Sequence, residues 1–320
     1  MLHSAPMLET LRLPPTGSLR ARVPASTSNL GPGFDLIGLA LDLPLGVTAR
    51  RDVSLTAHRL TLGTGEERAW PTGGDNLLLR GLDAGLRASH AASDTFFDLS
   101  VESEIPTRRG LGSSAAAIVA GLTLGACVGP HEVTRENLLE LALAIEGHPD
   151  NVSPALFGGC VLSLPVRGEA TRIVRVALHA SLAYAVAWPA TTLETAFARS
   201  ILPKSVLLSD AVENSRRLAL LLEGLRSGDA DLLRLGCEDR LHVPYRLPHI
   251  PGGAEALAAA RESGALIATI SGSGSALFAI ATRDNVARVA DAMRIELDRR
   301  GGPATAKTPA LAQGARVELA

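Results

Sequence analysis

The feature that most constrains this chain is the run Gly-Leu-Gly-Ser-Ser-Ala-Ala-Ala at residues 110–117. A strand-like stretch at 97–105 precedes it, and a helix of small apolar residues is predicted over 115–128. Gly110 and Gly112 allow the backbone to take positive φ and to approach a ligand closely. The two serines open the helix where free N–H groups and the positive end of the dipole collect. This arrangement predicts a phosphate site, although a serine-capped buried helix after a glycine turn accounts for the same residues.

The loop differs from the two best-known nucleotide-binding loops. A Walker A loop needs a lysine after its last glycine, and none follows Gly112, while a Rossmann loop spaces three glycines differently. The pattern Pro-x-x-x-Gly-Leu-Gly-Ser-Ser-Ala instead resembles the central motif of the GHMP kinases, a family of small-molecule kinases. That resemblance implies that ATP is bound by Pro106, Arg108, Arg109, Gly110, Leu111, Gly112, Ser113 and Ser114.

Composition disfavours several other classes of protein. The chain has 320 residues, enough for two lobes. Its formal net charge is −2, so no basic face indicates nucleic acid or anionic lipid. No apolar run reaches the roughly 20 residues of a membrane span, and the three cysteines lack metal-ligand spacing. Residues 1–17 lack the basic start and apolar stretch of a signal peptide, so we expect a cytoplasmic protein with no nucleic-acid or membrane partner.

A long irregular turn spans residues 24–35, Pro-Ala-Ser-Thr-Ser-Asn-Leu-Gly-Pro-Gly-Phe-Asp. Its glycines, prolines and small polar residues are typical of a plain surface loop. It also resembles the first GHMP motif in the branch of the family that phosphorylates homoserine, with Ser28 where alanine is usual. In that branch the residues matching Asn29 and Asp35 face the amino-acid substrate, and the resemblance implies the same here.

Asn76 precedes a predicted helix over 77–89. An asparagine at this position caps a helix by accepting a backbone N–H. The resemblance adds a contact with adenine, because homoserine-phosphorylating members carry an Asn-Leu pair at this place. The two roles are compatible, and the sequence favours neither.

A second helix begins after Thr134 and ends at Glu146. A carboxylate at a helix C-terminus opposes the dipole at a cost of up to about 1 kcal/mol, which a divalent cation would offset. One carboxylate, one hydroxyl and nucleotide phosphates form a typical Mg²⁺ set, so Ser114 and Glu146 are the predicted magnesium ligands. By itself Glu146 is better explained as a solvated side chain before a proline turn, but the glycine loop upstream favours the metal.

Residues 146–159, Glu-Gly-His-Pro-Asp-Asn-Val-Ser-Pro-Ala-Leu-Phe-Gly-Gly, match the homoserine-phosphorylating branch almost word for word. The resemblance implies that His148, Asp150 and Asn151 face the substrate. Zinc at His148 is disfavoured, since no second His or Cys lies at ligand spacing. Asn151 falls where mevalonate kinases carry an aspartate that is usually assigned as base, which implies transfer without a strong protein base, by positioning and charge stabilisation. The expected catalytic residues are Asn151, Glu146 and Ser114.

Two arginines in the second half of the chain are candidates for binding a carboxylate. Arg199 lies in Thr-x-x-x-Arg-x-x-Leu-Pro and Arg246 in Asp-x-x-His-x-x-x-Arg, and both segments resemble GHMP motifs of the same branch. A guanidinium fork can make two parallel charge-assisted bonds to a carboxylate. Most arginines are solvent-facing charges, and only the flanking motifs favour a substrate role for these two.

A glycine turn at residues 270–275, Ile-Ser-Gly-Ser-Gly-Ser, connects two predicted strands at 266–269 and 276–280. A simple hairpin explains the pattern. It also resembles the third GHMP motif, with Ser275 where proline is usual. Because glycines permit close backbone approach to a ligand, we expect the substrate to contact Gly272, Ser273 and Gly274.

The chain is expected to adopt an α+β fold, with a flexible tail at 1–17. The resemblance implies the GHMP kinase fold: an ATP-binding N-terminal lobe at 18–165, similar to ribosomal protein S5 domain 2, and a ferredoxin-like C-terminal lobe at 166–320. Hydrophobic alternation predicts strands in both lobes: a pair over 47–62, two that open the second lobe at 173–176 and 182–188, and one that closes it at 315–319.

The resemblance implies an ATP- and Mg²⁺-dependent enzyme that converts L-homoserine to O-phospho-L-homoserine in threonine biosynthesis. Two alternatives remain open: another small-molecule GHMP kinase, of the mevalonate or shikimate type, and a non-catalytic relative that senses a ligand. The 146–159 run and the two arginines weigh against the first alternative. Retention of Ser114, Glu146 and both glycine loops weighs against the second. The sequence does not decide between a monomer and a homodimer.

Overall fold

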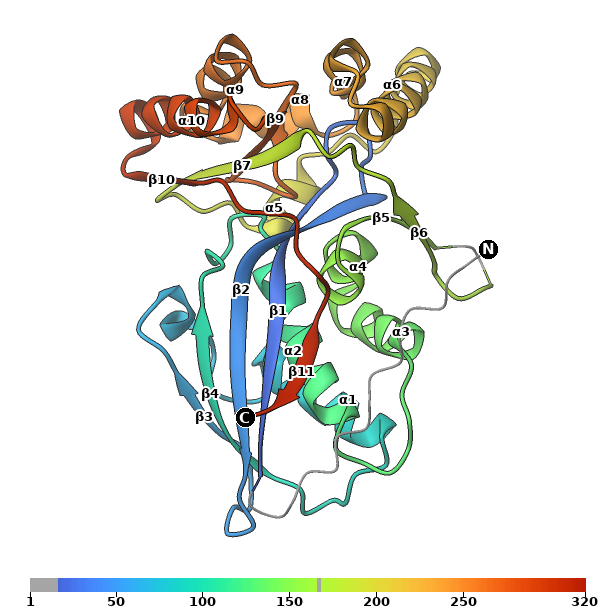
Figure 1. Ribbon diagram of the computed structural model, residues 1–320, viewed down its shortest axis with the longest axis vertical. Coiled ribbons are helices and arrows are strands. Elements are labelled where there is room, and N and C mark those ends of the chain that lie inside the picture. The colour runs from blue at the N-terminus through green and yellow to red at the C-terminus, as the bar shows by residue number, and fades with distance from the viewer. Residues whose placement is uncertain (1–16, 166–167) are drawn as a thin grey trace.

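A computed structural model describes residues 17–165 and 168–320, which form two lobes, one above the other in Figure 1. The predicted tail at 1–17 lies outside the described residues, except for Gly17. The first lobe contains a seven-stranded sheet in the order β11-β1-β2-β4-β3, with β5 pairing both β2 and β6. Its strands are β1 (Ser18–Ser28), β2 (Ile37–Arg51), β3 (Arg59–Leu62), β4 (Phe97–Ser103), β5 (Cys160–Leu164), β6 (Arg172–Val176) and β11 (Arg316–Leu319).

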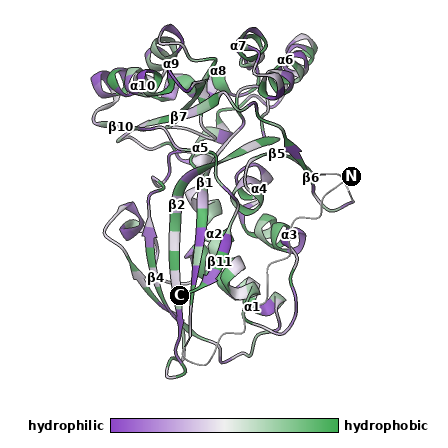
Figure 2. Cartoon of the chain, viewed as in Figure 1, coloured by the Kyte–Doolittle hydropathy of each residue, from purple (hydrophilic) through white to green (hydrophobic). Residues whose placement is uncertain are grey.

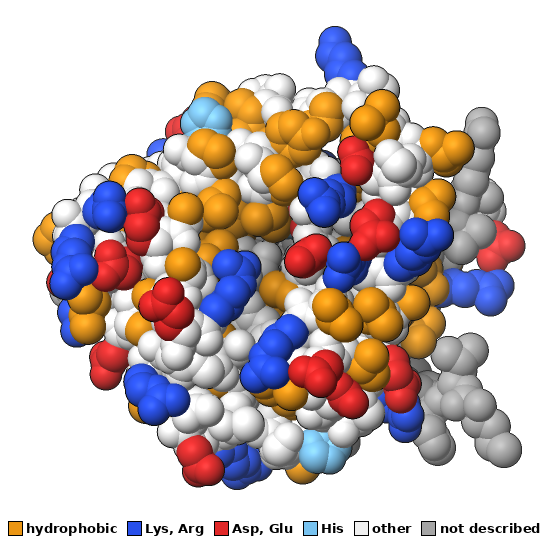
Figure 3. All heavy atoms as spheres, turned by 90° about the horizontal axis from the view of Figure 1, so that it is seen from above, with side chains coloured by type: hydrophobic (Ala, Val, Ile, Leu, Met, Phe, Trp, Pro, Cys, Tyr) orange, Lys and Arg blue, Asp and Glu red, His pale blue; other side chains and the backbone are white. Residues whose placement is uncertain are grey.

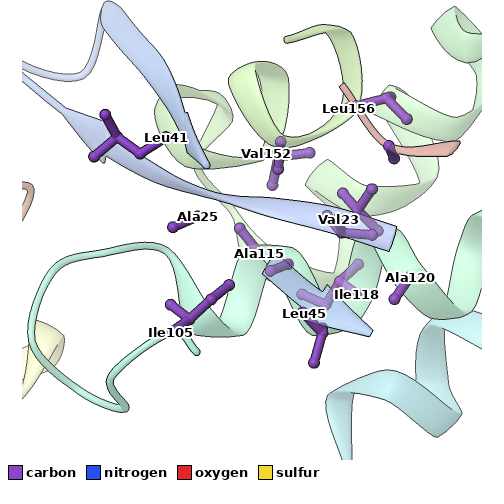
Figure 4. Close-up of a cluster of buried hydrophobic side chains, with 14 of the residues drawn as sticks. Val23, Ala25, Leu41, Leu45, Ile105, Ala115, Ile118, Ala120, Val152 and Leu156 are labelled. Atoms are coloured by element: carbon purple, nitrogen blue, oxygen red, sulfur yellow. The ribbon is translucent and has the colours of Figure 1, made fainter. Parts of the chain in front are cut away.

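Helix α2 (Ser113–Ala126) forms the centre of the first lobe. Every residue from 115 to 126 is buried, and a helix that is apolar on all sides belongs in a core. Ile118 of this helix lies in one hydrophobic cluster with Val23 and Leu45 of the sheet (Figure 4). This packing holds the N-terminus of α2, where the sequence predicts a phosphate site. The other helices of the lobe are α1 (Leu77–Ala88), α3 (Arg135–Glu146), α4 (Pro149–Phe157) and the 3₁₀ helix η1 (Glu66–Ala69).

The second lobe is built on an antiparallel sheet in the order β10-β7-β9-β8. Along β7, Tyr184 and Val186 pack into the core shared with the first lobe, whereas Ala185 and Ala187 belong to a second core with residues of α9 and α10. Hydrophobic residues follow the strands in Figure 2, and hydrophilic ones mark the outer parts of α6 and α10. The strands are β7 (Leu182–Pro189), β8 (Ile267–Ile270), β9 (Leu277–Thr282) and β10 (Ala304–Lys307). The helices are α5 (Thr195–Ser200), α6 (Leu208–Ser227), α7 (Ala230–Gly236), α8 (Val243–Arg246), α9 (Gly253–Glu262), α10 (Val286–Gly301) and the 3₁₀ helix η2 (Leu247–His249).

Three strand predictions are wrong in their partners. The strand at 315–319 does not close the second lobe, because β11 pairs antiparallel with β1. The strand at 173–176 does not open that lobe either, since β6 pairs with β5. Within 47–62, β3 pairs in parallel with β4 and not with β2. Alternation identifies a strand but not its partner. The division at residue 165 stays a prediction.

The upper face of the second lobe mixes side chains of both charges. In Figure 3, Lys and Arg alternate with Asp and Glu, and apolar side chains gather between them. This face therefore does not present an electrostatic field of a single sign.

Among the helices of residues 17–165 and 168–320, none has both the length and the apolar character needed to cross a membrane.

Candidate active site

The start of α2 presents backbone N–H groups to the site. Its N-cap is Gly112, with φ of 71°, and no side chain of residues 17–165 or 168–320 forms a capping hydrogen bond there. The serine-capped helix considered from the sequence is therefore not what forms. The first-turn N–H groups and the positive end of the dipole at Ser113 and Ser114 can receive an anion.

The glycines of this loop serve contacts between loops. A Cβ on Gly110 would lie 2.2 Å from the carbonyl oxygen of Ser271, and one on Gly112 would lie 2.1 Å from the hydroxyl oxygen of Ser26. Ser271 also donates a hydrogen bond of 2.7 Å to the carbonyl of Gly110. The three glycine-rich segments of the sequence are thus packed directly on one another across the two lobes.

A pocket beside the start of α2, here the Trp70 pocket, contains several residues predicted to bind ATP. Asn76 lines it and caps α1, accepting from the N–H groups of Leu78 at 2.9 Å and Leu79 at 3.1 Å. Capping is confirmed, and adenine contact stays a prediction. Sequence reasoning missed Trp70, which no motif marks. The lining residues are Glu66, Arg68, Ala69, Trp70, Pro71, Asp75, Asn76, Leu77, Thr107, Arg108, Arg109, Ser113, Ser114, Ala117 and Thr192.

The two adjacent arginines of the loop have different environments. Arg109 is buried and donates through Nε to the carbonyl of Pro189 at 2.9 Å, through Nη2 to that of Ala190 at 3.0 Å, and through Nη1 to Glu66 at 2.5 Å. It joins the two lobes. Arg108 has a left-handed backbone with φ of 58°, and its exposed side chain lies 3.6 Å from Glu194. Arg108 is the one freer to meet a phosphate.

A second pocket, here the Arg246 pocket, adjoins the first and shares Arg108, Ser113 and Ser114 with it. It brings together most residues predicted to bind substrate, from both lobes. Pro106, Leu111, Gly272 and Gly274 line neither pocket. The lining residues are Ser28, Asn29, Asp35, Arg108, Gly110, Gly112, Ser113, Ser114, Glu146, His148, Asp150, Asn151, Thr195, Arg199, Arg246 and Ser273.

Asn29 and Asp35 are held in left-handed conformations, with φ of 73° and 55°. Such backbones are costly outside glycine and concentrate at functional sites. The Asn29 side chain is buried, accepts from the N–H of Asp35 at 3.0 Å and donates to the carbonyl of Gly272 at 2.9 Å. Asn29 therefore connects the first and third glycine-rich motifs and orients Asp35. Gly272 acts here through its carbonyl.

Asp35 and Arg199 form a two-pronged ion pair in the Arg246 pocket, with N···O distances of 2.8 and 3.1 Å. The Nε atom of Arg199 is buried without a hydrogen-bond partner among the described residues. The ring of Phe34, which sequence reasoning missed, lies under both arginines. Its centroid is 5.8 Å from Cζ of Arg199 and 5.2 Å from Cζ of Arg246. Asp35 and Arg199, both predicted to contact the substrate, thus pair with each other.

Arg246 is only 2% exposed, and within residues 17–165 and 168–320 no carboxylate forms an ion pair with it. It donates through Nε to the carbonyl of Ala198 at 3.1 Å and through Nη1 to that of Gly272 at 3.2 Å. Burial, with the neighbouring Arg199 charge, lowers its pKa to about 10. A buried cation that is not neutralised is costly, and a bound anion would relieve the cost.

Two further acidic groups of the Arg246 pocket, Glu146 and Asp150, lie around the turn after α3. Burial, together with the charge of Asp150, raises the pKa of Glu146 to about 7. Burial also raises the pKa of Asp150, against a hydrogen bond from Ser28 that lowers it. The Nδ1 atom of His148 lies 3.1 Å from the carbonyl oxygen of Glu146, so it carries the proton. Both carboxyl groups are held where ionisation needs a cation.

The Asn151 amide is fixed by two serines of the first motif. It donates to the hydroxyl of Ser28 at 3.0 Å and accepts from that of Ser26 at 2.9 Å. Ser28 is the residue that departs from the usual alanine of the GHMP motif, so its hydroxyl adds a contact that alanine could not make. An amide cannot take up a proton as a carboxylate does, which agrees with transfer without a strong base at this position.

The residues present fit a Mg²⁺ ion. Ser114 and Glu146 line the same pocket, and the carboxylate has a pKa raised to about 7 by burial, which a metal would lower. Among the described residues no group of three or more His, Cys, Asp or Glu side chains could hold a metal alone. Mg²⁺ takes one or two protein carboxylates and completes its shell with phosphate and water.

Family models match both halves of the chain: the GHMP kinases N terminal domain over residues 76–159 and the GHMP kinases C terminal domain over 221–299. The chain belongs to the GHMP kinase family, and the predicted fold is confirmed. Relatives that are similar in sequence over most of the chain include homoserine kinases. That of Synechococcus sp. (strain CC9311) is 43% identical over 273 residues, 85% of this chain and 86% of that protein.

Two further relatives carry the same name. The homoserine kinase of Synechococcus sp. (strain RCC307) is 41% identical over 280 residues, 87% of this chain and 89% of that protein. The crystal structure of homoserine kinase from Cytophaga hutchinsonii matches with a TM-score of 0.85 and 28% identity, covering 96% of this chain and 99% of that one. The match thus extends through both lobes.

Proposed function

We propose that the protein is a homoserine kinase, which transfers the γ-phosphoryl group of ATP to the hydroxyl of L-homoserine. The observation that carries the proposal is the meeting of the two pockets at Arg108, Ser113 and Ser114. One pocket offers an aromatic ring and a free helix N-terminus. The other offers two guanidinium groups that can pair with a carboxylate and one carboxylate that can pair with an ammonium, and these complement the charges of an α-amino acid.

ATP is proposed to lie in the Trp70 pocket, with adenine near Trp70 and Asn76 and the phosphates at the start of α2. The N–H groups of Ser113 and Ser114 and the Arg108 guanidinium would hold the phosphates. Ser114 and Glu146 would hold Mg²⁺, which supplies neutralisation of the charge on the transferred group.

L-Homoserine is proposed to occupy the Arg246 pocket. Its carboxylate would pair with Arg199 and Arg246, and its ammonium with Asp35, oriented by Asn29 and assisted by Asp150. Asp35 and Arg199 would then give up some of their hydrogen bonds to each other. Asp35 would gain contacts to the substrate ammonium and Arg199 to the substrate carboxylate, so that no buried charge loses its partner. The product would be O-phospho-L-homoserine, which places the enzyme in threonine biosynthesis.

The side chain of Asn151, fixed by Ser26 and Ser28, is proposed to orient the attacking hydroxyl. The transition state of phosphoryl transfer is loose, so a strong base is not required. Most of the acceleration would then come from alignment of the two substrates and from the charges of Arg108 and the helix N-terminus.

A coupled ADP-release assay tests the proposal with L-homoserine, mevalonate, shikimate and L-serine at one concentration. We expect L-homoserine to be the best acceptor, with a phosphate monoester as product by ³¹P NMR. Faster turnover of mevalonate or shikimate would assign the protein to another GHMP activity. No ADP release with any of the four alcohols would favour a ligand sensor.

A further inference from the structure

His242 is a buried histidine that lies between the first glycine-rich motif and Arg246. It is 0% exposed and precedes α8. Its Nε2 atom is 2.9 Å from the carbonyl oxygen of Gly31, and its Nδ1 atom is 3.4 Å from Nη1 of Arg246. Its ring stacks on Phe34 at 5.2 Å, the same ring that lies under Arg246.

The two bonds require one state of the imidazole. A carbonyl oxygen can only accept, so Nε2 carries the proton toward Gly31. A guanidinium can only donate, so Nδ1 must offer its lone pair to Arg246. Only the neutral Nε2–H tautomer satisfies both neighbours.

We propose that His242 is a positioning residue of the Arg246 pocket: as the neutral Nε2–H tautomer it ties Arg246 to the Gly31 loop and orients the guanidinium toward the substrate carboxylate. The inference rests on the proposed function, because it assumes that Arg246 binds the acceptor. The same loop continues into Phe34 and Asp35, so His242 links the groups for both ends of an amino acid.

The surroundings of His242 make this arrangement sensitive to acid. Burial lowers the pKa of His242 most, Asp239 raises it, and Arg246 lowers it, with Asp35 a weaker raising influence. The Asp239 carboxylate lies 3.8 Å from Nε2, but its Oδ2 already accepts from the N–H groups of His242 at 2.8 Å and Val243 at 2.7 Å. A protonated Nδ1 would point an N–H at Arg246 and break the link.

Two variants separate the two bonds. In His242→Asn the side-chain oxygen can replace Nδ1 as acceptor for Arg246, whereas in His242→Gln the side-chain amide can replace Nε2 as donor to Gly31. We expect KM for homoserine to rise roughly tenfold or more in His242→Gln, which loses a bond to a charged group, and only about threefold in His242→Asn. The values of kcat and of KM for ATP should stay within about threefold of wild type. His179→Asn, at an exposed site, is the matched control.

The pH profile of wild-type KM for homoserine supplies the second measurement and does not depend on the folding of a variant. Because burial lowers the pKa of His242, KM should stay constant down to the ordinary histidine pKa of about 6.5 and rise only at a pH below it, and His242→Asn should lose that rise. Unchanged KM in both variants, or an equal fall of kcat in both, would overturn the inference. Failure of the wild type to phosphorylate homoserine would instead overturn the proposed function.

Discussion

The Trp70 pocket and the Arg246 pocket meet at the start of α2 but are built in different ways. The first is formed mostly by one lobe, from the segments 66–77 and 107–117. It uses a helix N-terminus, backbone groups and an aromatic ring. The second takes residues from six separated segments of both lobes and gathers charged side chains, most of them buried or half-buried.

The difference teaches which part of such an enzyme is general and which is specific. A helix N-terminus binds a phosphate whatever the acceptor is. The Arg246 pocket instead depends on Arg246, Arg199 and Asp35, whose charges must each find a partner. We therefore expect changes in the first pocket to alter use of ATP, changes in the second to alter use of homoserine, and changes at the junction to alter turnover.

The junction should give the largest effect. Glu146→Gln should lower kcat by roughly 10²–10³, because a lost contact to the transferring group costs about as much as a lost oxyanion donor. Steady-state ADP release at saturating Mg²⁺ checks this, with Glu136→Gln on the same helix as the control. A variant that keeps more than about a tenth of wild-type kcat would refute the metal role.

Thermal melting at pH 8 without Mg²⁺ shows whether the Glu146→Gln protein is folded. The pKa of Glu146 in the folded protein, about 7, lies above the ordinary glutamate value of 4.5, so the unfolded state binds fewer protons between these two pH values. Stability should fall as pH rises through that window. The variant should thus have a melting temperature equal to or higher than that of the wild type. A lower melting temperature would mean that Glu146 has a structural role.

Arg246→Ala and Arg199→Ala should raise KM for homoserine by roughly 10–100-fold, since a hydrogen bond to a charged group contributes about 1.5–3 kcal/mol. KM for ATP should hardly move. Lysine at either position should restore binding only in part, because it cannot make a two-pronged contact. Steady-state titration of both substrates tests this. A raised KM for ATP, or an unchanged KM for homoserine in both variants, would contradict the assignment of homoserine to the Arg246 pocket.

Acid should weaken the use of Mg²⁺. With a pKa of about 7, Glu146 is mostly protonated at low pH, so the free Mg²⁺ needed for half-maximal rate should be about tenfold higher at pH 6 than at pH 8. The Glu146→Gln variant should show a smaller change. An equal change in the variant would assign the effect to the nucleotide.

Trp70→Ala should give the smallest effect and test the other side of the comparison. Loss of an aromatic contact should raise KM for ATP roughly 2–10-fold and leave KM for homoserine unchanged. Because Trp70→Phe keeps a ring, its KM for ATP should lie between those of Trp70→Ala and the wild type. A rise in KM for homoserine alone would mean that Trp70 does not contact the nucleotide.

Contiguous motifs made much of this site predictable. The segments around residues 110–117 and 146–159 are local, and their helix ends form where the sequence indicates. Phe34 and Trp70 were missed because neither stands out by type or spacing. Their contacts are with residues that are distant in the chain, Arg246 for Phe34 and Thr107 for Trp70.

The same limit explains the misplaced strands. β11 completes the first sheet although it ends the chain, because β1 offers an edge that local pattern cannot reveal. The sequence predicts positive φ at Gly110 and Gly112, and the structure has it. A side chain at these positions would collide with Ser271 and Ser26, two contacts that the local pattern does not reveal. Sequence motifs identify residues under constraint, and only the assembled lobes show what constrains them.

The most direct test of the central claim compares three alcohols at saturating ATP and Mg²⁺: L-homoserine, 4-hydroxybutyrate, which lacks the ammonium, and 3-amino-1-propanol, which lacks the carboxylate. If the Arg246 pocket recognises both charges of an amino acid, kcat/KM should fall at least roughly tenfold for each analogue while KM for ATP stays constant. An analogue used within about threefold of L-homoserine would show that its missing charge is not recognised, and the assignment of this pocket would be wrong.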